Sequence, residues 1–143
     1  MEGLMLKGIG FVYFQQGKLE DAVGLVKKAL RIFRKTLGRE SEEAIDALVG
    51  IATILSSGCK CKRAEATETY EEALGIRRRA LGDEHEKLMG LLYVLGTLKI
   101  EEEDVEGAIE YLREAQGICE RKGLSGEMAT NVATALASLE GGA

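Results

Sequence analysis

Gly17-Lys18-Leu19-Glu20-Asp21-Ala22 opens a stretch of sequence that continues to Ala29-Leu30 and ends at Leu37-Gly38. Parts of this stretch return later in the chain. Ala29-Leu30 recurs 44 residues later as Ala73-Leu74, and Leu37-Gly38 recurs at the same interval as Leu81-Gly82. A helical pair repeated at such a period cannot bury its apolar face alone. The repeats therefore predict a stacked helical array rather than a globule around one centre.

The composition agrees with an all-α domain. The chain has 143 residues, of which 45% are hydrophobic and 30% are charged, so one domain over residues 1–143 is expected. Proline is absent and aromatic residues make up only 5%, which removes the usual helix breaker and many strand-forming residues. The net charge of −5 argues against nucleic acid as a partner, because phosphate binding needs a basic face.

Three cysteines, Cys59, Cys61 and Cys119, are an odd number in a chain that needs no disulfide staples. We therefore expect an intracellular, reducing compartment, either the cytoplasm or an organelle interior. No apolar run reaches the length of a membrane span, and residues 1–16 lack the pattern of a signal peptide. Direct membrane insertion is not expected.

Apolar residues recur at helical spacing throughout the chain and predict three helical hairpins followed by one more helix. The hairpins are expected at about residues 3–38, 41–82 and 84–123, and the final, capping helix at about 127–139. Ser41 is a suitable N-cap for the third helix. A helix from about Leu19 to Leu37 is expected to bury Ala22, Val26, Ala29, Leu30 and Phe33. The residues expected to be buried in the first and last helices are Leu6, Ile9, Gly10, Tyr13, Val132, Ala133, Leu136 and Ala137.

Small residues fall at equivalent places in the repeats: Gly10, Ala52, Gly96 and Ala137; then Ala22, Ala66 and Ala108; then Ala29, Ala73 and Ala115. Small side chains allow two helix backbones to approach closely where the helices cross. This pattern resembles the tetratricopeptide repeat (TPR). The Leu81-Gly82-Asp83-Glu84-His85 segment resembles the link of the kinesin light chain subclass. The resemblance implies a right-handed α-solenoid of three TPR hairpins plus a C-terminal capping helix.

The resemblance also implies a concave groove lined by the first helix of each repeat, where a protein or peptide partner would bind. Mapped onto this chain, the candidate groove residues are Lys7, Phe11, Phe14, Val49, Thr53, Tyr93, Val94, Thr97, Ile100 and Asn131. Relatives that clamp a carboxylate need several basic residues there, and only Lys7 is present. Paired asparagines typical of kinesin light chains are replaced by Lys7-Gly8, Val49-Gly50 and Tyr93-Val94. Gly8, Gly50 and Gly90 are expected to leave room for a helix.

We therefore expect a non-catalytic adaptor or scaffold that binds a helical or apolar segment of a partner protein, with aromatic anchors in the groove. Two alternatives remain open: a self-associating structural unit, and a regulatory domain that holds an enzyme partner inactive. Catalysis is not expected, because the single His85 has no recognisable catalytic constellation around it. No cofactor is expected.

Two further features have both a structural and a functional interpretation. Cys59 and Cys61 lie in an expected loop, where incidental thiols are favoured over a redox pair, and a zinc site lacks the required four ligands. Basic residues gather on second helices of the repeats, at Arg77-Arg78-Arg79 and at Lys27, Lys28, Arg31, Arg34 and Lys35. A solvated face paired with Glu20, Glu71 and Glu72 is favoured over a patch that binds phosphate or an anionic partner.

Overall fold

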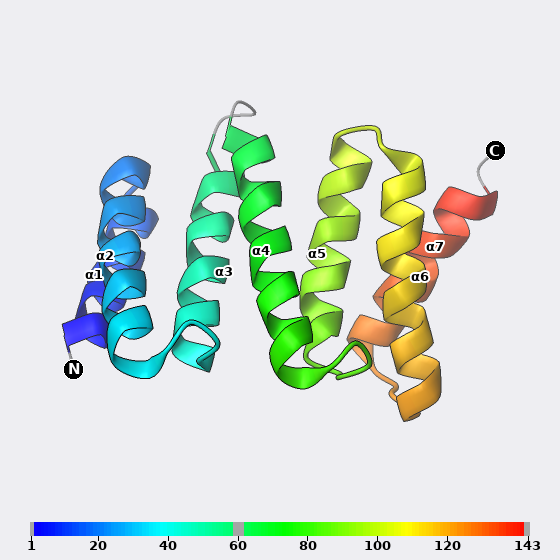
Figure 1. Ribbon diagram of the computed structural model, residues 1–143. Coiled ribbons are helices and arrows are strands. Elements are labelled where there is room, and N and C mark those ends of the chain that lie inside the picture. Colours follow the sequence, from blue (N-terminus) through cyan, green and yellow to red (C-terminus); the bar gives the residue numbers. More distant parts are fainter. Residues whose placement is uncertain (1, 59–61, 142–143) are drawn as a thin grey trace. The chain divides into compact units, whose positions relative to one another are not determined.

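A computed structural model describes residues 2–58 and 62–141 of the chain, and all regular secondary structure in those ranges is helical (Figure 1). The helices are α1 (Glu2–Gln15), α2 (Leu19–Leu37), α3 (Glu42–Ser56), α4 (Arg63–Leu81), α5 (Leu88–Glu101), α6 (Val105–Lys122) and α7 (Glu127–Gly141). These form two compact units, residues 1–80 and 81–143. The expected all-α class is confirmed.

In the first unit, α2 has the amphipathic pattern that the sequence predicts. Its buried residues are Ala22, Val26, Ala29, Leu30 and Phe33, at helical spacing along one stripe. The next helix, α3, is buried over most of its surface and contributes nine core residues. Ser41 caps α3 as expected, because its side chain accepts a hydrogen bond of 3.2 Å from the backbone N–H of Ala44.

The first helix differs from expectation, since only Gly3 and Gly10 of α1 are buried. Of the four residues predicted to be buried, Gly10 is confirmed, Leu6 and Tyr13 are only half-buried, and the prediction for Ile9 is wrong because it is exposed. The glycines explain the difference. A Cβ atom on Gly10 would lie 2.8 Å from Val26 Cγ2, and one on Gly3 would lie 2.7 Å from Phe33 Cε1. Because α2 meets the bare backbone of α1, the neighbouring large side chains of α1 remain outside this contact.

The second unit is built around the leucines of α5. Leu88, Leu92 and Leu95 of α5 are fully buried, as is Leu112 of α6. The cap of α6 is Asp104, whose carboxylate accepts a hydrogen bond of 3.0 Å from the Gly107 N–H.

The last helix, α7, packs through a narrower face than the sequence predicts. Val132 and Leu136 are buried as expected, but Ala133 and Ala137 are exposed. Each of these alanines follows a buried residue directly and is therefore turned by about 100° from it around the helix. Ala137 consequently does not repeat the buried role of Gly10, Ala52 and Gly96.

Gly96→Ala is expected to destabilise the protein by about 1–3 kcal/mol, because overpacking displaces core side chains. The added Cβ would lie 2.9 Å from both Cγ and Cδ2 of Leu112. Gly90→Ala is the matched control in the same helix, since no atom lies within 4 Å of its Cβ position. The control is expected to stabilise α5 by about 0.5–1 kcal/mol. The unfolding temperatures of the two variants are measured by circular dichroism. Equal changes in unfolding temperature for Gly96→Ala and Gly90→Ala would contradict the close contact between Gly96 and Leu112.

Candidate protein-interaction surface

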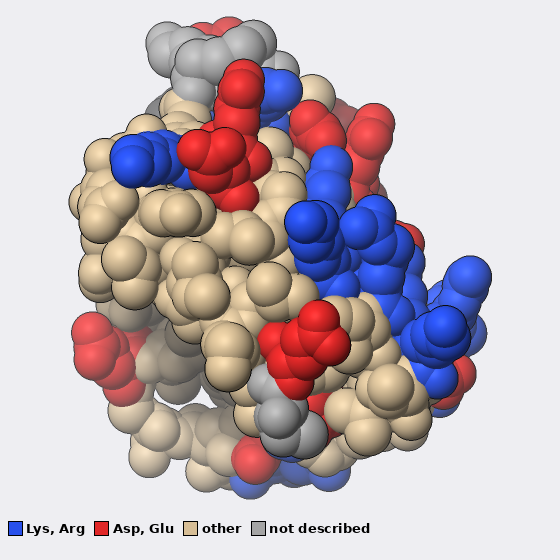
Figure 2. Space-filling model, turned by 90° about the vertical axis from the view of Figure 1, so that its left-hand side faces the viewer, with Lys and Arg blue, Asp and Glu red and all other residues tan. Residues whose placement is uncertain are grey.

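The most apolar exposed surface of the first unit lies on α1. Five of its large hydrophobic residues are exposed: Leu4, Met5, Ile9, Phe11 and Val12. Only Glu2 and Lys7 of this helix are charged. Figure 2, which views the N-terminal helices, accordingly shows a broad area free of charged side chains. An exposed apolar area of this kind is typical of a protein interface.

These residues form two stripes along α1. Leu4 and Phe11 are seven residues apart and therefore share one face, on which the sequence analysis places the groove. Met5, Ile9 and Val12 have i, i+4, i+7 spacing and form a second stripe about 100° away. Phe11 is 44% exposed and Met5 is 66% exposed, so neither stripe is part of the core. The sequence analysis assigned Phe11 to the groove but did not predict the second stripe.

The other groove candidates of the first unit are less accessible. Lys7, Phe14, Val49 and Thr53 are all half-buried. The Thr53 hydroxyl lies 2.8 Å from the Val49 carbonyl oxygen and 2.9 Å from the Tyr70 hydroxyl. Its hydrogen-bonding capacity is therefore largely used within the unit.

Gly50 does not leave the open space that the sequence analysis expected. It is buried, and its Cβ position lies 3.7 Å from Val26 Cγ1, so Gly50 belongs to the packing of α3 against α2. Gly8 has no atom within 4 Å of its Cβ position and does leave room.

In the second unit, α5 supplies Tyr93, Val94 and Thr97, which are half-buried, and Ile100, which is exposed. Asn131 of α7 is also half-buried. The Thr97 hydroxyl donates a hydrogen bond of 2.8 Å to the Val94 carbonyl oxygen.

A cavity of about 400 Å³ lies between the first turns of α5 and α7 and was not predicted from the sequence. Its apolar lining includes Met89, Leu124 and Met128, and the open side of Gly90 faces it. Gly90 precedes Tyr93 by three residues and Val94 by four, so this recess lies about one helical turn from those two predicted groove residues.

The sequence matches models of one family over most of its length. Three models described as tetratricopeptide repeat match residues 2–67, 62–86 and 90–122. The chain belongs to the tetratricopeptide repeat family. Among curated proteins, none has a sequence that matches it.

Several solved structures are similar to the chain in fold. BtubC (BKLC) from P. vanneervenii has 20% sequence identity and a TM-score of 0.80, with 97% of this chain and 55% of that chain covered. TPR-like repeats assigned to a kinesin light chain of Podosopora anserina have 22% identity and a TM-score of 0.76, covering 94% of this chain and 64% of that one. The chain thus spans less than two thirds of either structure.

These findings confirm the predicted solenoid class of TPR hairpins and its likeness to kinesin light chain repeats. TPR modules mediate protein–protein interactions, so a protein partner is implied. No helix among the described residues is long and apolar enough to cross a membrane.

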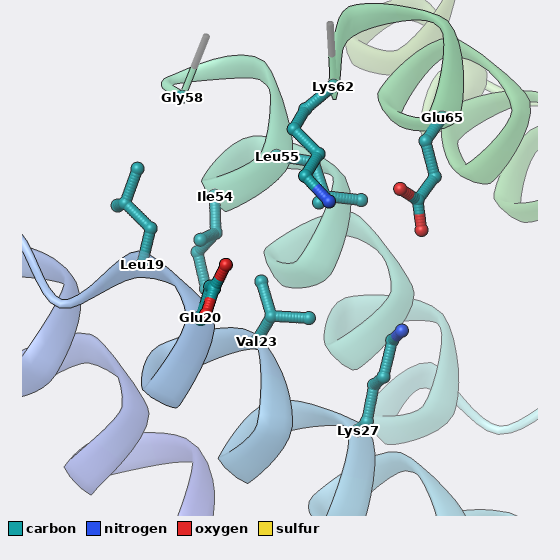
Figure 3. A pocket seen from close by; sticks show the side chains of 9 residues that line it. All are labelled: Leu19, Glu20, Val23, Lys27, Ile54, Leu55, Gly58, Lys62 and Glu65. Atoms are coloured by element: carbon teal, nitrogen blue, oxygen red, sulfur yellow. The ribbon is translucent and has the colours of Figure 1, made fainter.

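The first TPR unit also contains a cavity of about 350 Å³ between α2, the end of α3 and the start of α4 (Figure 3). Leu19, Val23, Ile54 and Leu55 supply its apolar lining. Figure 3 shows charged side chains around this lining, from Glu20, Lys27, Lys62 and Glu65. Leu19 and Val23 are four residues apart on α2, outside its core stripe, which is the signal that could have revealed this cavity from sequence.

Charged groups in the repeats are partly neutralised within each unit. Arg77 of α4 binds Glu42 of α3 at 3.1 Å and Asp46 at 3.7 Å. In the second unit, Lys99 lies where TPR helices usually have an apolar residue, and its amino group lies 3.7 Å from Glu102 and 3.9 Å from Asp104. Lys99 thus pairs with acids at the end of its own helix and just beyond it.

The buried thiol of Cys119 contacts Met89, which lines the second unit's cavity. Its Sγ atom lies 3.6 Å from Sδ of Met89, and burial raises the pKa of the Cys119 thiol. The thiol therefore stays protonated at neutral pH and has little nucleophilic character. Cys59 and Cys61 lie outside the described residues. Within the described ranges, no group of three His, Cys, Asp or Glu side chains could hold a metal ion.

Proposed function

We propose that this TPR chain is a non-catalytic adaptor or scaffold that binds a helical or apolar segment of a partner protein. In the first unit, the contact would involve Lys7, Phe11, Phe14, Val49 and Thr53. In the second unit, it would involve Tyr93, Val94, Thr97, Ile100 and Asn131. The mode of binding would be that of an amphipathic helix laid on an apolar surface.

The main support for this proposal is the exposed side chain of Phe11 on α1, a helix that has only two charged residues. Aromatic side chains that bury a large area are the commonest anchors of protein interfaces. The recess beside Gly90 supports the same role for the second unit, because it could receive an apolar side chain of the partner.

Self-association is a second candidate, favoured by the stripe of Met5, Ile9 and Val12. The i, i+4, i+7 spacing suits the packing of one helix on another. Under this alternative, the mass of the protein in solution rises with concentration, and Ile9→Glu with Val12→Glu returns it to the monomer mass. Sedimentation equilibrium measures the mass of wild type and of the double variant at several protein concentrations. A monomer at all concentrations would eliminate self-association and leave the adaptor proposal.

A regulatory role is compatible with the same surface, since a segment of an enzyme could be the bound partner. The proposed setting is a reducing intracellular compartment, in keeping with the free, buried thiol of Cys119.

Affinity capture from native lysate tests the adaptor proposal. Wild type is compared with Phe11→Asp and with Tyr93→Asp, so that each unit is tested separately. Proteins retained by wild type and lost from a variant are expected, and mass spectrometry identifies them. If the two variants and wild type captured the same proteins in equal amounts, the proposed surface would be wrong.

A further inference from the structure

The charges of the chain are distributed unevenly. Residues 22–39 contain six Lys and Arg residues and no Asp or Glu, so this segment carries +6. Since the whole chain carries −5, the rest carries −11. Figure 2 shows Lys and Arg side chains gathered in one group on one side of the N-terminal helices.

Five of these cations are exposed: Lys27, Lys28, Arg31 and Lys35 of α2, and Arg39 just after it. We call them the basic face. Arg31 lies four residues after Lys27, three after Lys28 and four before Lys35, so each of the other three cations in α2 neighbours Arg31 on the helix surface. None of the five forms an ion pair with another residue in the described part of the chain. Pairing with nearby acids, expected from the sequence, is confirmed for Arg34, which bonds Glu72 at 3.5 Å, and is wrong for the basic face.

Unpaired cations at these spacings destabilise a helix, because each like-charged pair repels. The helix dipole favours positive charge in the last turn of α2, but it does not account for Lys27 and Lys28 near the middle of the helix. By contrast, Arg77 on α4 is paired with Glu42 and Asp46. Single cations elsewhere, such as Arg79 and Lys122, also have no ion pair among the described residues, and the basic face differs from them in grouping five such cations.

A cavity of about 340 Å³ adjoins the basic face. Lys27, Arg31 and Arg34 line its α2 side, and Leu48 and Ile51 of α3 contribute apolar lining. The Nε atom of Arg34 is buried and has no hydrogen-bond partner in the described structure. Arg34 itself is bonded to Glu72 at 3.5 Å, so the cavity adds an apolar recess beside the charge of the basic face.

We infer that the basic face binds an acidic segment of a partner protein, at a surface distinct from the proposed groove. From Lys27 to Arg39 the chain extends over about 18 Å, the length of about six residues of extended peptide. The opposite side of the cavity carries Glu65 and Glu72 of α4, so the acidic segment lies along α2 and not along α4.

A protein segment fits this surface better than a membrane or a nucleic acid. Both of those present negative charge over a much longer distance than the basic face. They would also bring that charge close to the remaining chain, which carries −11 and would repel it. A short acidic segment matches the basic face in both length and sign.

The test uses the whole chain and a fluorescent peptide of twelve glutamates, with a twelve-glutamine peptide as a neutral control. Fluorescence anisotropy is measured with wild type, with Lys28→Glu plus Lys35→Glu, and with the matched control Arg79→Glu plus Lys122→Glu. Both double variants change the net charge equally, and Arg79 and Lys122 are exposed outside the basic face. Wild type and the control are expected to bind the glutamate peptide, and the basic-face variant about tenfold more weakly.

The basic-face variant should fold normally, because each substitution replaces a cation that repels Arg31 with a carboxylate that attracts it, three or four residues away along α2. We therefore expect the two double variants to unfold at the same temperature although they differ in binding to the glutamate peptide. Equal binding by both variants, or no binding by wild type, would overturn the inference. It would also be overturned if wild type bound anionic vesicles or duplex DNA but not the glutamate peptide. Failure of the groove variants in affinity capture would leave this result unchanged.

Discussion

Ala73→Asp is expected to unfold the first TPR unit. Ala73 lies on α4 and is completely buried, as are the equivalent residues Ala29 and Ala115. A carboxylate at this position would lose its hydration without gaining a partner, and its larger side chain would separate the packed helices. We expect a loss of more than about 4 kcal/mol, which exceeds the reserve of many domains of this size.

Ala64→Asp provides the control for this prediction, since Ala64 is exposed in the first turn of the same helix. A carboxylate near a helix N-terminus is favourable, so this variant should retain the wild-type unfolding temperature. The unfolding temperatures of wild type and both variants are measured by circular dichroism at 222 nm. If Ala73→Asp unfolded at the same temperature as Ala64→Asp, the packing described for α4 would be incorrect.

Phe11→Asp combined with Tyr93→Asp is expected to have the largest effect on binding. Each substitution places a charge where the proposed partner segment lays its apolar side chains. Loss of both anchors is expected to weaken binding by about 700-fold or more, because each anchor contributes about 2 kcal/mol or more and about 1.4 kcal/mol corresponds to a factor of ten. Phe11 is exposed and Tyr93 is half-buried, so the double variant should remain helical.

Leu37→Asp combined with Val105→Asp is the matched control for the groove variant. Both residues are exposed and apolar, one lies in each unit, and neither belongs to the proposed groove. This control should bind the partner as wild type does. Loss of helicity in the groove variant, with the control intact, would show that Tyr93 belongs to the core and that the groove mapping is incorrect.

The helices were predictable from sequence because the repeat constrains them twice, by apolar spacing and by recurrence. The Ala-Leu and Leu-Gly repeats place α2 at residues 19–37, as observed, and the predicted stripe from Ala22 to Phe33 is its buried face. Ser41 acts as the expected N-cap of α3. These features depend on local chemistry, which a single sequence contains.

The features that could not be predicted depend on which side chains of a neighbouring helix contact each residue. Ile9 has the spacing of a core residue, but α2 contacts the glycines of α1 instead. Gly50 appeared suited to an open groove, yet Val26 lies over it. Arg77 and Lys28 are equally basic in the sequence, and only the fold gives Arg77 carboxylate partners from another helix. Contacts with a neighbouring helix determine all three outcomes, within one repeat for Ile9 and Arg77 and between two repeats for Gly50.

The central claim is that the faces carrying Phe11 and Tyr93 bind a segment of a partner protein. Isothermal titration calorimetry of a captured partner against purified wild type, the groove variant and the matched control tests it most directly. We predict that wild type and the Leu37→Asp, Val105→Asp control have the same dissociation constant and that the Phe11→Asp, Tyr93→Asp variant binds about 700-fold more weakly. Equal dissociation constants for all three proteins would contradict the claim.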